Sequence, residues 1–437
     1  MTESTITGAA HGTSKLLRVA AAPGIVPRLL REQTGREDLS EYLATGGYAP
    51  SPDLSALLQA VEASGLRGRG GAAFPFTRKV AAVRASRTAP VVLANGEEGE
   101  PASVKDRWLM RTRPHLVLDG VRLAVQLVGA SHAVVYLSDE ESERSIWQAL
   151  EERPVDGYSV SVHRVEPTYI AGEETAAVRA VNGGPAKPTD KPPRPFEVGV
   201  GGQPTLVSNV ETLANLPFLA ARGVDEFRTY GTDGAPGTFL LTLGGAVTTP
   251  GLYEVALGTP LRDAVDQLGG NRGVIAGTLM GGYFAGLIGP RAEQLTLDYD
   301  SLSQAGSGLG CGAVSILGGD HCPVAVAADV MAYFGRENAG QCGSCFNGTA
   351  AMAGVLASLR EGSADRTDVE RLRRWGEVLP GRGACATLDG AANLARSLLL
   401  EFPDQVEGHL GTTCDVCGGA PQLKPFAMTM EPEGSRR

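Results

Sequence analysis

Cysteine is absent from the first 310 residues of the chain, and all seven cysteines lie between Cys311 and Cys417. A secreted protein held together by disulfides would spread its cysteines more evenly, and an odd number would leave one without a partner. This distribution argues against a disulfide-stabilised extracellular protein. It indicates metal or redox chemistry in a separate module near the C-terminus.

Other features are missing as well. The chain has no Lys/Arg-rich run and a net charge of -10, which argues against binding to nucleic acid or to an anionic membrane surface. It also lacks an apolar run of 18 residues and a signal-like start, so we expect no direct membrane insertion. Aromatic residues are scarce at 5%, whereas glycine (58) and proline (27) are plentiful. We expect a cytoplasmic protein, free or peripheral to a membrane complex.

What is present alternates between two patterns. Short apolar runs bounded by turn residues indicate strands, and amphipathic stretches between them indicate helices, one opening with Ser51 as its N-cap and Pro52 behind it. Strands are expected at 90–95, 133–137 and 158–165, and further helices at 116–128 and from Glu141. This alternation predicts an α/β domain with a parallel sheet.

The pattern changes twice further along the chain. After Gly237 two strands flank a turn at 249–251 and a short helix follows, capped by Thr259, which predicts a small β-grasp module. From about Pro323 four amphipathic helices predict a bundle with the cysteines at its helix ends. The expected division is an irregular arm at 1–50, the α/β domain at 51–235, the β-grasp module at 236–292, a connector and helical bundle at 293–410, and an irregular, cysteine-containing tail at 411–437.

A glycine-dense loop, "GLRGRGGAAF", contains Gly68-x-Gly70-x-x-Ala73. The dinucleotide fingerprint of this form follows a strand and opens a helix, but here a helix precedes the loop, so that interpretation is rejected. With Arg67 and Arg69 the loop can still let backbone N–H groups approach a phosphate or an isoalloxazine ring. A merely flexible loop is the alternative.

Polar side chains gather at three further places, each with a structural explanation. Carboxylates after the strand at 90–95 could accept hydrogen bonds from a ligand, or they could form a solvated loop. A pair of carboxylates at a helix start could bind a ribose or cap the helix. A third set of polar side chains, at another helix start, suits a phosphate. These side chains are Glu97, Glu98 and Glu100; Glu173 and Glu174; and Ser208, Asn209 and Thr212.

The order and spacing of these motifs carry more information than any one of them. "GLRGRGGAAFP", "EEGEPASVKDR", "YIAGEETA", "KPPRPF", "SNVETLAN", "LDYDSLSQAGSGLG" and the Cys-x-x-Cys bundle resemble the NADH-binding flavoprotein subunit of respiratory complex I and its relatives in NAD-reducing hydrogenases and formate dehydrogenases. The resemblance runs from about Leu39 to Leu410. It implies FMN and NADH in the α/β domain, a β-grasp module of the SLBB type, and a bundle carrying one [4Fe–4S] cluster.

The resemblance also implies roles for individual residues. FMN and its phosphate would be held by Gly68, Arg69, Gly70, Gly71, Lys79, Asn95, Ser208, Asn209 and Thr212, with the adenine on Phe74, the nicotinamide end at Glu100 as the catalytic position, and the adenosine ribose on Glu174. The same motifs add Glu97, Glu98, Tyr169, Gly172 and Glu173 to the cofactor-binding set. A carboxylate at the ribose repels a 2′-phosphate, so NADH is preferred to NADPH. Ser208 and Glu97 depart from the family's Asn and Asp, and the longer Glu97 is expected to weaken FMN binding.

The largest departure is in the cluster motif. The family reads S-C-G-x-C-x-P-C-R where this chain reads "NAGQCGSCF". The resemblance therefore implies Cys342, Cys345 and Cys385 as three ligands, and Ala339 replaces the first cysteine of the motif, which would be the fourth ligand. A [4Fe–4S] cluster takes four thiolates. Four outcomes stay open: a cluster with a foreign fourth ligand, a [3Fe–4S] centre, rescue by Cys414 or Cys417, or no cluster. Cys311 and Cys322 are interpreted as small buried hydrophobes.

The function that follows is a flavin-dependent NADH dehydrogenase (diaphorase) module. It would pass electrons from NADH through FMN to an iron–sulfur centre and on to other redox subunits or a ferredoxin-like partner. The six histidines are scattered along the chain, so no triad suggests another mechanism. The alternative is a degenerate scaffold subunit that keeps the fold and has lost the redox chain.

Overall fold

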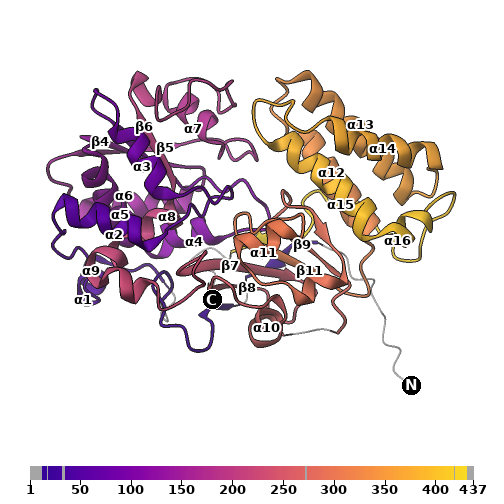
Figure 1. Cartoon of the computed structure of the whole chain (residues 1–437), viewed down its shortest axis with the longest axis horizontal. Helices are drawn as coiled ribbons and strands as arrows, with labels where there is room; N and C mark the ends of the chain where they lie inside the picture. Colours follow the sequence, from indigo (N-terminus) through magenta and orange to yellow (C-terminus); the bar gives the residue numbers. More distant parts are fainter. Residues whose placement is uncertain (1–11, 17, 32–34, 271–272, 418, 431–437) are drawn as a thin grey trace.

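The structure is a computed structural model that describes residues 12–16, 18–31, 35–270, 273–417 and 419–430. Figure 1 shows three parts: an α/β domain, a central sheet module, and a helical bundle at the far side from the α/β domain. No helix among the described residues combines the length and the apolar character needed to cross a membrane.

The α/β domain is built on a parallel four-stranded sheet in the order β5-β4-β3-β6. Its first strand, β3, is the buried run VVLA followed by Asn95, and it is central in the sheet because both of its faces are apolar. The strands are β3 (Val91–Asn95), β4 (His132–Leu137), β5 (Ser159–Arg164) and β6 (Thr205–Asn209). The helices around them are α2 (Leu54–Ser64), α3 (Phe76–Arg84), α4 (Lys105–Thr112), α5 (Pro114–Val128), α6 (Glu140–Glu152), α7 (Glu174–Val181), α8 (Val210–Ala214) and α9 (Leu216–Phe227).

The α/β architecture and the strand positions confirm the sequence prediction. The predicted cap of the first long helix was wrong, however. Helix α2 begins at Leu54, and Asp53 rather than Ser51 accepts the backbone N–H of Ala56. Either side chain can cap a helix, and the local pattern did not distinguish them.

The central module holds a mixed six-stranded sheet in the order β10-β9-β11-β7-β8-β2. Its strands are β2 (Arg18–Ala21), β7 (Thr238–Gly245), β8 (Gly251–Ala256), β9 (Gly277–Met280), β10 (Leu287–Ile288) and β11 (Ala313–Leu317). The shorter helical segments here are α10 (Leu261–Ala264), η2 (Val265–Gly269), η3 (Pro290–Gln294) and α11 (Tyr299–Gln304), and η1 (Val200–Gly202) belongs to the α/β domain. The short helix starts behind Pro260 without a side-chain cap, so the predicted Thr259 cap is also wrong.

Two of these strands come from outside the range predicted for the β-grasp module. Strand β2 belongs to the expected N-terminal arm and β11 to the expected connector. The arm is fastened by the buried carboxylate of Glu254 on β8, which accepts the N–H groups of Arg28, Leu29 and Leu30. Helix α1 (Leu39–Ala44) follows. The expectation of an irregular arm therefore fails for this stretch, whereas residues 1–11 lie outside the described part.

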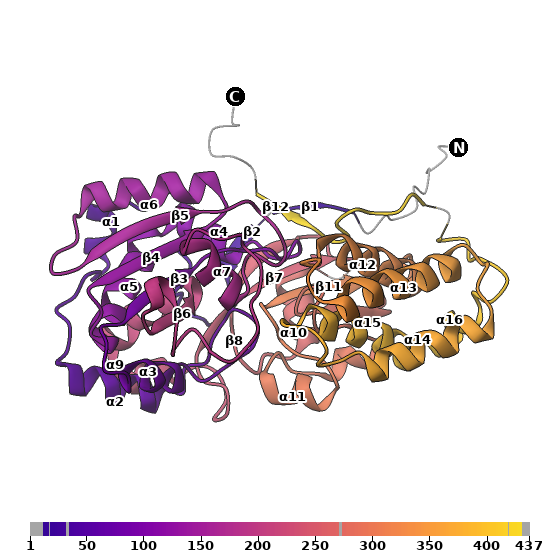
Figure 2. The same ribbon diagram turned by 90° about the horizontal axis from the view of Figure 1, so that it is seen from above.

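The bundle consists of α12 (Pro323–Glu337), α13 (Gly343–Arg360), α14 (Arg366–Val378) and α15 (Thr387–Glu401), with the short α16 (Pro403–Glu407) behind it. Figure 2 shows the long helices side by side. Only residues 338–342 connect α12 to α13. A connection this short places the two helices antiparallel, so their N-terminal ends lie at opposite ends of the bundle.

The chain beyond the bundle does not stay irregular. It returns toward the α/β domain, where the N–H of Met428 donates to the carbonyl of Pro101 at 2.8 Å. There β12 (Met428–Thr429) pairs in parallel with β1 (Ser14–Lys15), which Figure 2 shows above the junction of the domains. The first and last strands of the described part thus meet near the acidic loop that follows β3.

Candidate functional site

The glycine loop lies against the carboxyl end of β6. Its base is closed by the N–H of Gly68, which donates to the carbonyl of Phe74 at 2.9 Å. A Cβ atom on Gly70 would stand 3.1 Å from the Cβ of Asn209, and Gly71 has a φ of +123° with no atom within 4 Å of where its Cβ would stand. Glycine is required where backbone comes this close or adopts such a conformation. The loop therefore exposes bare backbone at the end of the sheet.

The side chain of Arg69 joins the glycine loop to the central module. Its guanidinium is buried and points into the central module, where Nη1 contacts the hydroxyl of Tyr299 and Nη2 donates to the carbonyl of Thr238 at 3.1 Å. Its backbone N–H donates to the hydroxyl of Thr212 at 2.8 Å. These contacts anchor the loop to the second sheet, so any part of Arg69 in holding FMN stays a prediction that falls to its backbone.

Two asparagines end neighbouring strands in register, Asn95 on β3 and Asn209 on β6. Asn95 donates to the carbonyl of Gly172 at 2.8 Å, and Asn209 donates to Asp106 at 2.8 Å. Next to Asn209, Ser208 is buried in β6. These side chains hold the rim of the site rather than project freely from it.

Beneath Asn209 lies a buried charged cluster that the sequence analysis missed. The ammonium of Lys105 is 1% exposed and lies 2.7 Å from Asp106 and 3.0 Å from Glu211. Burial alone lowers the pKa of Lys105, but the two carboxylates more than offset this and hold the pKa above its ordinary value. Lys105 also donates to Asn209 at 3.3 Å. The "KDR" within the acidic motif was the available signal, but nothing local shows that this lysine is buried.

Glu98 makes its hydrogen bonds to the end of its own loop and to the first turn of α4. Its oxygens accept from the hydroxyl of Ser103 at 2.6 Å, from the backbone of Asp106 at 3.2 Å, and from Nε of Arg107 at 3.1 Å. With these partners it has no lone pair directed to a ligand. The prediction of Glu98 as a cofactor-binding residue is not supported, and its role is to shape the turn into α4.

Glu97 has the opposite character. It is 7% exposed, and neither carboxylate oxygen has a well-formed hydrogen bond among the described residues. Burial raises the pKa of Glu97 to about 7, although the nearby hydroxyl of Ser138 acts in the other direction. A Cβ on Gly172 would lie 3.1 Å from the Glu97 carbonyl, so the two loops pack closely here. A buried carboxyl group without a partner is costly, and a bound ligand that hydrogen-bonds it would remove that cost.

Glu100 lies where all three parts meet. Its carboxylate accepts the N–H of Tyr283 at 3.0 Å, from the central module, and the N–H of Ala102 at 3.3 Å. Burial raises the pKa of Glu100 to about 8, so the group holds a proton at neutral pH. Tyr169 stands nearby, edge-on to Tyr333 of the bundle with ring centres 5.7 Å apart.

The two carboxylates at the start of α7 have different roles. Glu173 is the helix cap: it accepts from the backbone of Thr175 and Ala176 and pairs with Lys191 at 2.7 Å. Glu174 makes no such cap and lies 3.7 Å from Lys79 and 3.6 Å from Lys191. The capping explanation therefore holds for Glu173, whereas Glu174 stays available to a ligand.

Two predicted ligand contacts lie at the open edge of the site. Lys79 donates to the carbonyl of Val207 at 3.1 Å, and burial lowers its pKa, opposed by Glu174. Phe74 is 44% exposed, beside Ala73, which adopts the left-handed φ of 50°. An exposed ring held by a strained neighbour is suited to stacking on a flat ligand.

The predicted cluster cysteines come together at one end of the bundle. Cys342 is the N-cap residue of α13, Cys345 lies in its first turn, and Cys385 precedes α15. The N–H of Ala384 donates to Sγ of Cys342 at 3.3 Å, which joins the two loops. Burial, then the neighbouring Cys385 and Cys342, raises the pKa of Cys345 to about 11. A bound cation would favour the thiolate form.

Ala339, at the fourth position, lines a cavity of about 620 Å³ between the α/β domain and the end of α12. Its walls include Arg164, Lys187 and Arg336. Glu166 and Glu337 line it as well, so the place of the missing ligand borders an open space of mixed charge and not packed core. A small exogenous ligand can reach it.

Cys414 and Cys417 lie elsewhere. In the described part of the chain they group with Cys322 and His409, all four ligand atoms within 4.8 Å of one another. Cys322 is the N-cap residue of α12, so about 22 Å of helix separates this group from Ala339. The structure thus argues against rescue by the tail cysteines. It also contradicts both the interpretation of Cys322 as a mere hydrophobe and the view that all histidines are scattered.

The residues present fit the cofactors that the resemblance implies. Bare glycine backbone, the exposed Phe74 and the unpartnered Glu97 carboxylate form a cradle at the carboxyl ends of β3 and β6, where α/β sheets bind nucleotides. Three thiols fit three of the four ligand positions of a [4Fe–4S] cluster.

Comparison with known proteins agrees with this geometry. Residues 61–218 match the Nuo51 FMN-binding domain, 240–272 the SLBB domain, and 325–409 the NADH-ubiquinone oxidoreductase-F iron-sulfur binding region. The F 2 subunit of NADH-quinone oxidoreductase from Rhizobium meliloti (strain 1021) is 35% identical over 85% of this chain and 94% of its own length. The corresponding F subunit of Streptomyces coelicolor is 32% identical over 87% of each chain.

A solved structure has the same fold. The NAD⁺-reducing [NiFe]-hydrogenase in the H₂-reduced state superposes with a TM-score of 0.77 at 29% identity, over 87% of this chain and 68% of that chain. The FMN-binding, SLBB and iron–sulfur matches follow one another in the order that the sequence predicted. The chain therefore belongs to the family of NADH-quinone oxidoreductase F subunits.

Proposed function

We propose that the chain is an FMN-dependent NADH dehydrogenase (diaphorase) module that passes electrons to an iron–sulfur centre and on to a partner carrier. The observation that carries this is the cradle at the ends of β3 and β6, where glycine backbone packs on Asn209 and the buried carboxyl group of Glu97 has no well-formed hydrogen bond within the described part of the chain. Family membership supports the same activity. FMN, when bound, supplies hydride acceptance from NADH and release of single electrons.

The residues of the chain would bind FMN and NADH, orient them, and place charges and protons beside them. The N–H groups of Gly70 and Gly71 and the ammonium of Lys79 would hold FMN, with Gly68 closing the base of the loop and Asn95, Ser208, Asn209 and Thr212 shaping its cleft. Phe74 would stack on the adenine of NADH. Glu97 can donate or accept a hydrogen bond, since its pKa is about 7. Glu100 would receive the nicotinamide end, and it carries its proton at neutral pH.

The first prediction tests this function. Protein reconstituted anaerobically with FMN should bind one FMN, bleach on addition of NADH, and reduce ferricyanide. Thr212→Val should weaken FMN binding about tenfold, because it leaves the Arg69 N–H without an acceptor at a cost of roughly 1–3 kcal/mol. Fluorescence titration of FMN measures it.

The matched control is Thr278→Val in β9. Its hydroxyl is buried and has no hydrogen-bond partner among the described residues, so the same change should leave FMN affinity as it is. Equal losses in both variants would mean that the glycine loop does not depend on Thr212. Wild-type protein with neither flavin absorbance nor bleaching would instead support the scaffold alternative.

The second prediction concerns nucleotide choice. Glu174→Ala should raise the NADPH:NADH ratio of kcat/KM about tenfold, roughly 1.4 kcal/mol. It removes a negative charge that would repel a 2′-phosphate, and it leaves the ammonium groups of Lys79 and Lys191, both within 4.0 Å of Glu174, as the nearest charges. Steady-state kinetics with both nucleotides measure the ratio.

Glu173→Gln is the control for this change. It removes one charge at the adjacent position, but Glu173 is committed to the α7 cap, so it should lower thermal stability and leave the nucleotide ratio unmoved. If both variants shift the ratio alike, the effect is one of general charge and Glu174 is not the discriminator.

Electrons need a destination outside the chain. The relatives are named as subunits of NADH-quinone oxidoreductase, which supports other redox subunits as partners. A small iron–sulfur or ferredoxin-like protein docking near the bundle is our specific proposal, and a cytoplasmic or membrane-peripheral location stays a prediction.

A further inference from the structure

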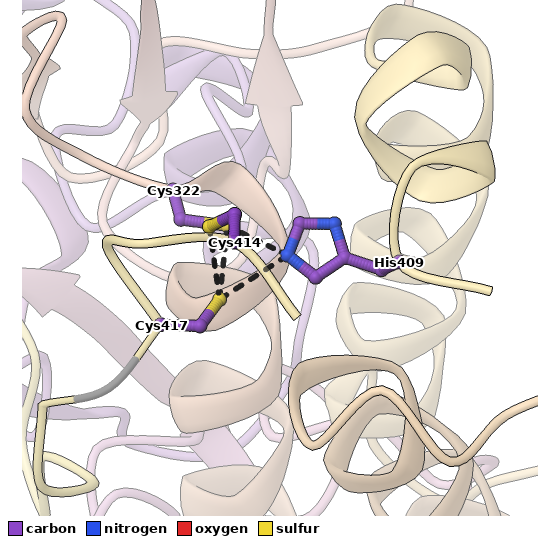
Figure 3. A group of neighbouring side chains, drawn as sticks. All are labelled: Cys322, His409, Cys414 and Cys417. Carbon is purple, nitrogen blue, oxygen red and sulfur yellow. Dashed lines mark hydrogen bonds between the residues drawn. The ribbon is translucent and has the colours of Figure 1, made fainter. Parts of the chain in front are cut away.

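A second group of metal-ligating side chains lies at the end of the bundle opposite to Ala339. It brings together Cys322 at the start of α12, His409 just past α16, and the Cys-x-x-Cys pair Cys414 and Cys417 of the tail. Figure 3 shows the three sulfur atoms and one imidazole nitrogen converging on a common point. Cys322, His409 and Cys417 are buried, and all the sulfurs are free thiols.

The spacing of these atoms is close to that of a tetrahedral site, and a small outward movement of the side chains would admit the ion. Sγ of Cys417 lies 3.3 Å from Sγ of Cys322 and 3.5 Å from Sγ of Cys414. Nε2 of His409 lies 3.2 Å and 3.5 Å from the sulfurs of Cys417 and Cys322. A Zn²⁺ ion with its usual bond lengths separates its ligand atoms by about 3.5–3.8 Å. These sulfurs are much too far apart for a disulfide, and too close to surround a four-iron cube.

The histidine is oriented for a metal by its other nitrogen. Nδ1 of His409 lies 2.6 Å from the carbonyl oxygen of Gln405. A carbonyl can only accept, so Nδ1 carries the proton and Nε2 presents its lone pair to the sulfurs. Metal-bound histidines are typically held in this way. Without a metal this lone pair accepts an S–H hydrogen bond from Cys417 or Cys322, and once the thiols lose their protons it is available as a ligand.

A buried cation, Arg360, lies beside the site and is itself paired with Asp329. Three thiolates and one Zn²⁺ leave a net charge of about −1. Arg360 lies beside the tail, where its guanidinium donates to the carbonyl of Gly419 and to Asp329, both at 2.6 Å. The hydroxyl of Thr413 donates to the carbonyl of Arg360 at 3.1 Å. The loop around the cysteines is thus built against a buried cation.

We propose that Cys322, His409, Cys414 and Cys417 bind one structural Zn²⁺ ion. Cys₃His with four protein ligands is a closed set that leaves no open position for a substrate. Three of these ligands lie outside the region 325–409 that matches the iron–sulfur binding family, so the zinc site is separate from the cluster site and does not rest on the proposed function.

The zinc site would hold one end of the tail, which runs from the bundle to the α/β domain. Beyond the cysteines, the N–H of Gln422 donates to Asp329 at 3.0 Å, Tyr283 contacts the carbonyl of Pro425, and the N–H of Met428 meets Pro101 beside the acidic loop. Zinc would fix the N-terminal end of this tail segment, at Cys414 and Cys417, to the bundle. The segment beyond it then contacts the bundle, the central module and the α/β domain.

The test is the metal content of the full chain, purified anaerobically from zinc-supplemented cells. We expect about one zinc per wild-type chain, a fall of at least about tenfold in Cys414→Ser and His409→Gln, and no change in the matched control Cys311→Ser, whose thiol lies outside the group. Zinc-edge X-ray absorption should show three sulfurs and one nitrogen. Wild-type zinc below about a tenth per chain, or zinc unchanged in the two ligand variants, would overturn the proposal.

A second measurement avoids dependence on variants that fail to fold. Zinc is removed from wild-type protein with a chelator, and backbone hydrogen exchange is followed by mass spectrometry. The amides of Gln422 and Met428 should exchange at least about tenfold faster without zinc, whereas those of β3 should not change. Equal protection of the tail with and without zinc would contradict the fastening role.

Discussion

Ala339→Cys is expected to produce a complete, air-stable [4Fe–4S] cluster where the wild-type chain holds a labile one. Ala339 stands three residues before Cys342 and lines an open cavity, so a thiol there can reach the iron that otherwise binds solvent or an exogenous ligand. Four protein thiolates hold all four irons. The Ala339→Cys variant should retain about four irons per chain after exposure to air, whereas the wild-type protein should lose iron or convert to [3Fe–4S].

The measurement is iron, acid-labile sulfide and EPR on both proteins after identical anaerobic reconstitution. Ala353→Cys, on the same helix as Cys345 but roughly 12 Å along it, adds a thiol that cannot reach the site and should behave like wild type. Cys385→Ser should lose the cluster and keep its zinc. Full [4Fe–4S] occupancy in air-exposed wild type would show that the missing thiolate does not matter. No iron in either protein would mean that the bundle is purely structural.

Lys105→Met is expected to destabilise the protein by about 3–5 kcal/mol, because it strands buried carboxylates. Asp106 and Glu211 are almost fully buried beside the Lys105 ammonium, and neither can reach water to recover its hydration. Asn209 loses a partner at the same time, so FMN affinity should fall as well. Urea unfolding of the FMN-free protein measures the first effect and FMN titration the second.

Two variants sharpen this test. Lys424→Met changes an exposed lysine of the tail and should alter the free energy of unfolding by less than about 0.5 kcal/mol. The double variant Lys105→Met/Glu211→Gln removes one stranded charge and should recover part of the loss. If Lys105→Met is as harmless as Lys424→Met, the cluster is not a buried electrostatic support for the site.

Several features were determined by the sequence itself. The apolar runs at 90–95, 133–137 and 158–165 predicted β3, β4 and β5, since the hydrophobic period and the turn residues around them are local properties. The glycine loop, the strand end at Asn95, the helix start at Asn209 and the family followed from motif order, because ligand-binding backbone needs particular residues at fixed spacing. The missing cluster ligand was visible as Ala339 for the same reason.

Tertiary structure decided which polar side chains are available to a ligand. Glu97 and Glu98 are adjacent and chemically alike, yet one is unpartnered and the other fully bonded. The difference depends on Ser103 and Arg107 turning back over one of them. Arg69 likewise faces Thr238 and Tyr299 of the second sheet, contacts that span 169 and 230 positions.

The same physical reason explains the remaining discrepancies. Strand β2 joins the sheet through β8, which is far away in the sequence, and Cys322 meets Cys417 across 95 positions. Hydrophobic periodicity and capping report on neighbours within a few residues along the chain. Which distant segments share a sheet, or which four side chains share a metal, depends on how the packed elements place their ends, and only the folded chain determines that.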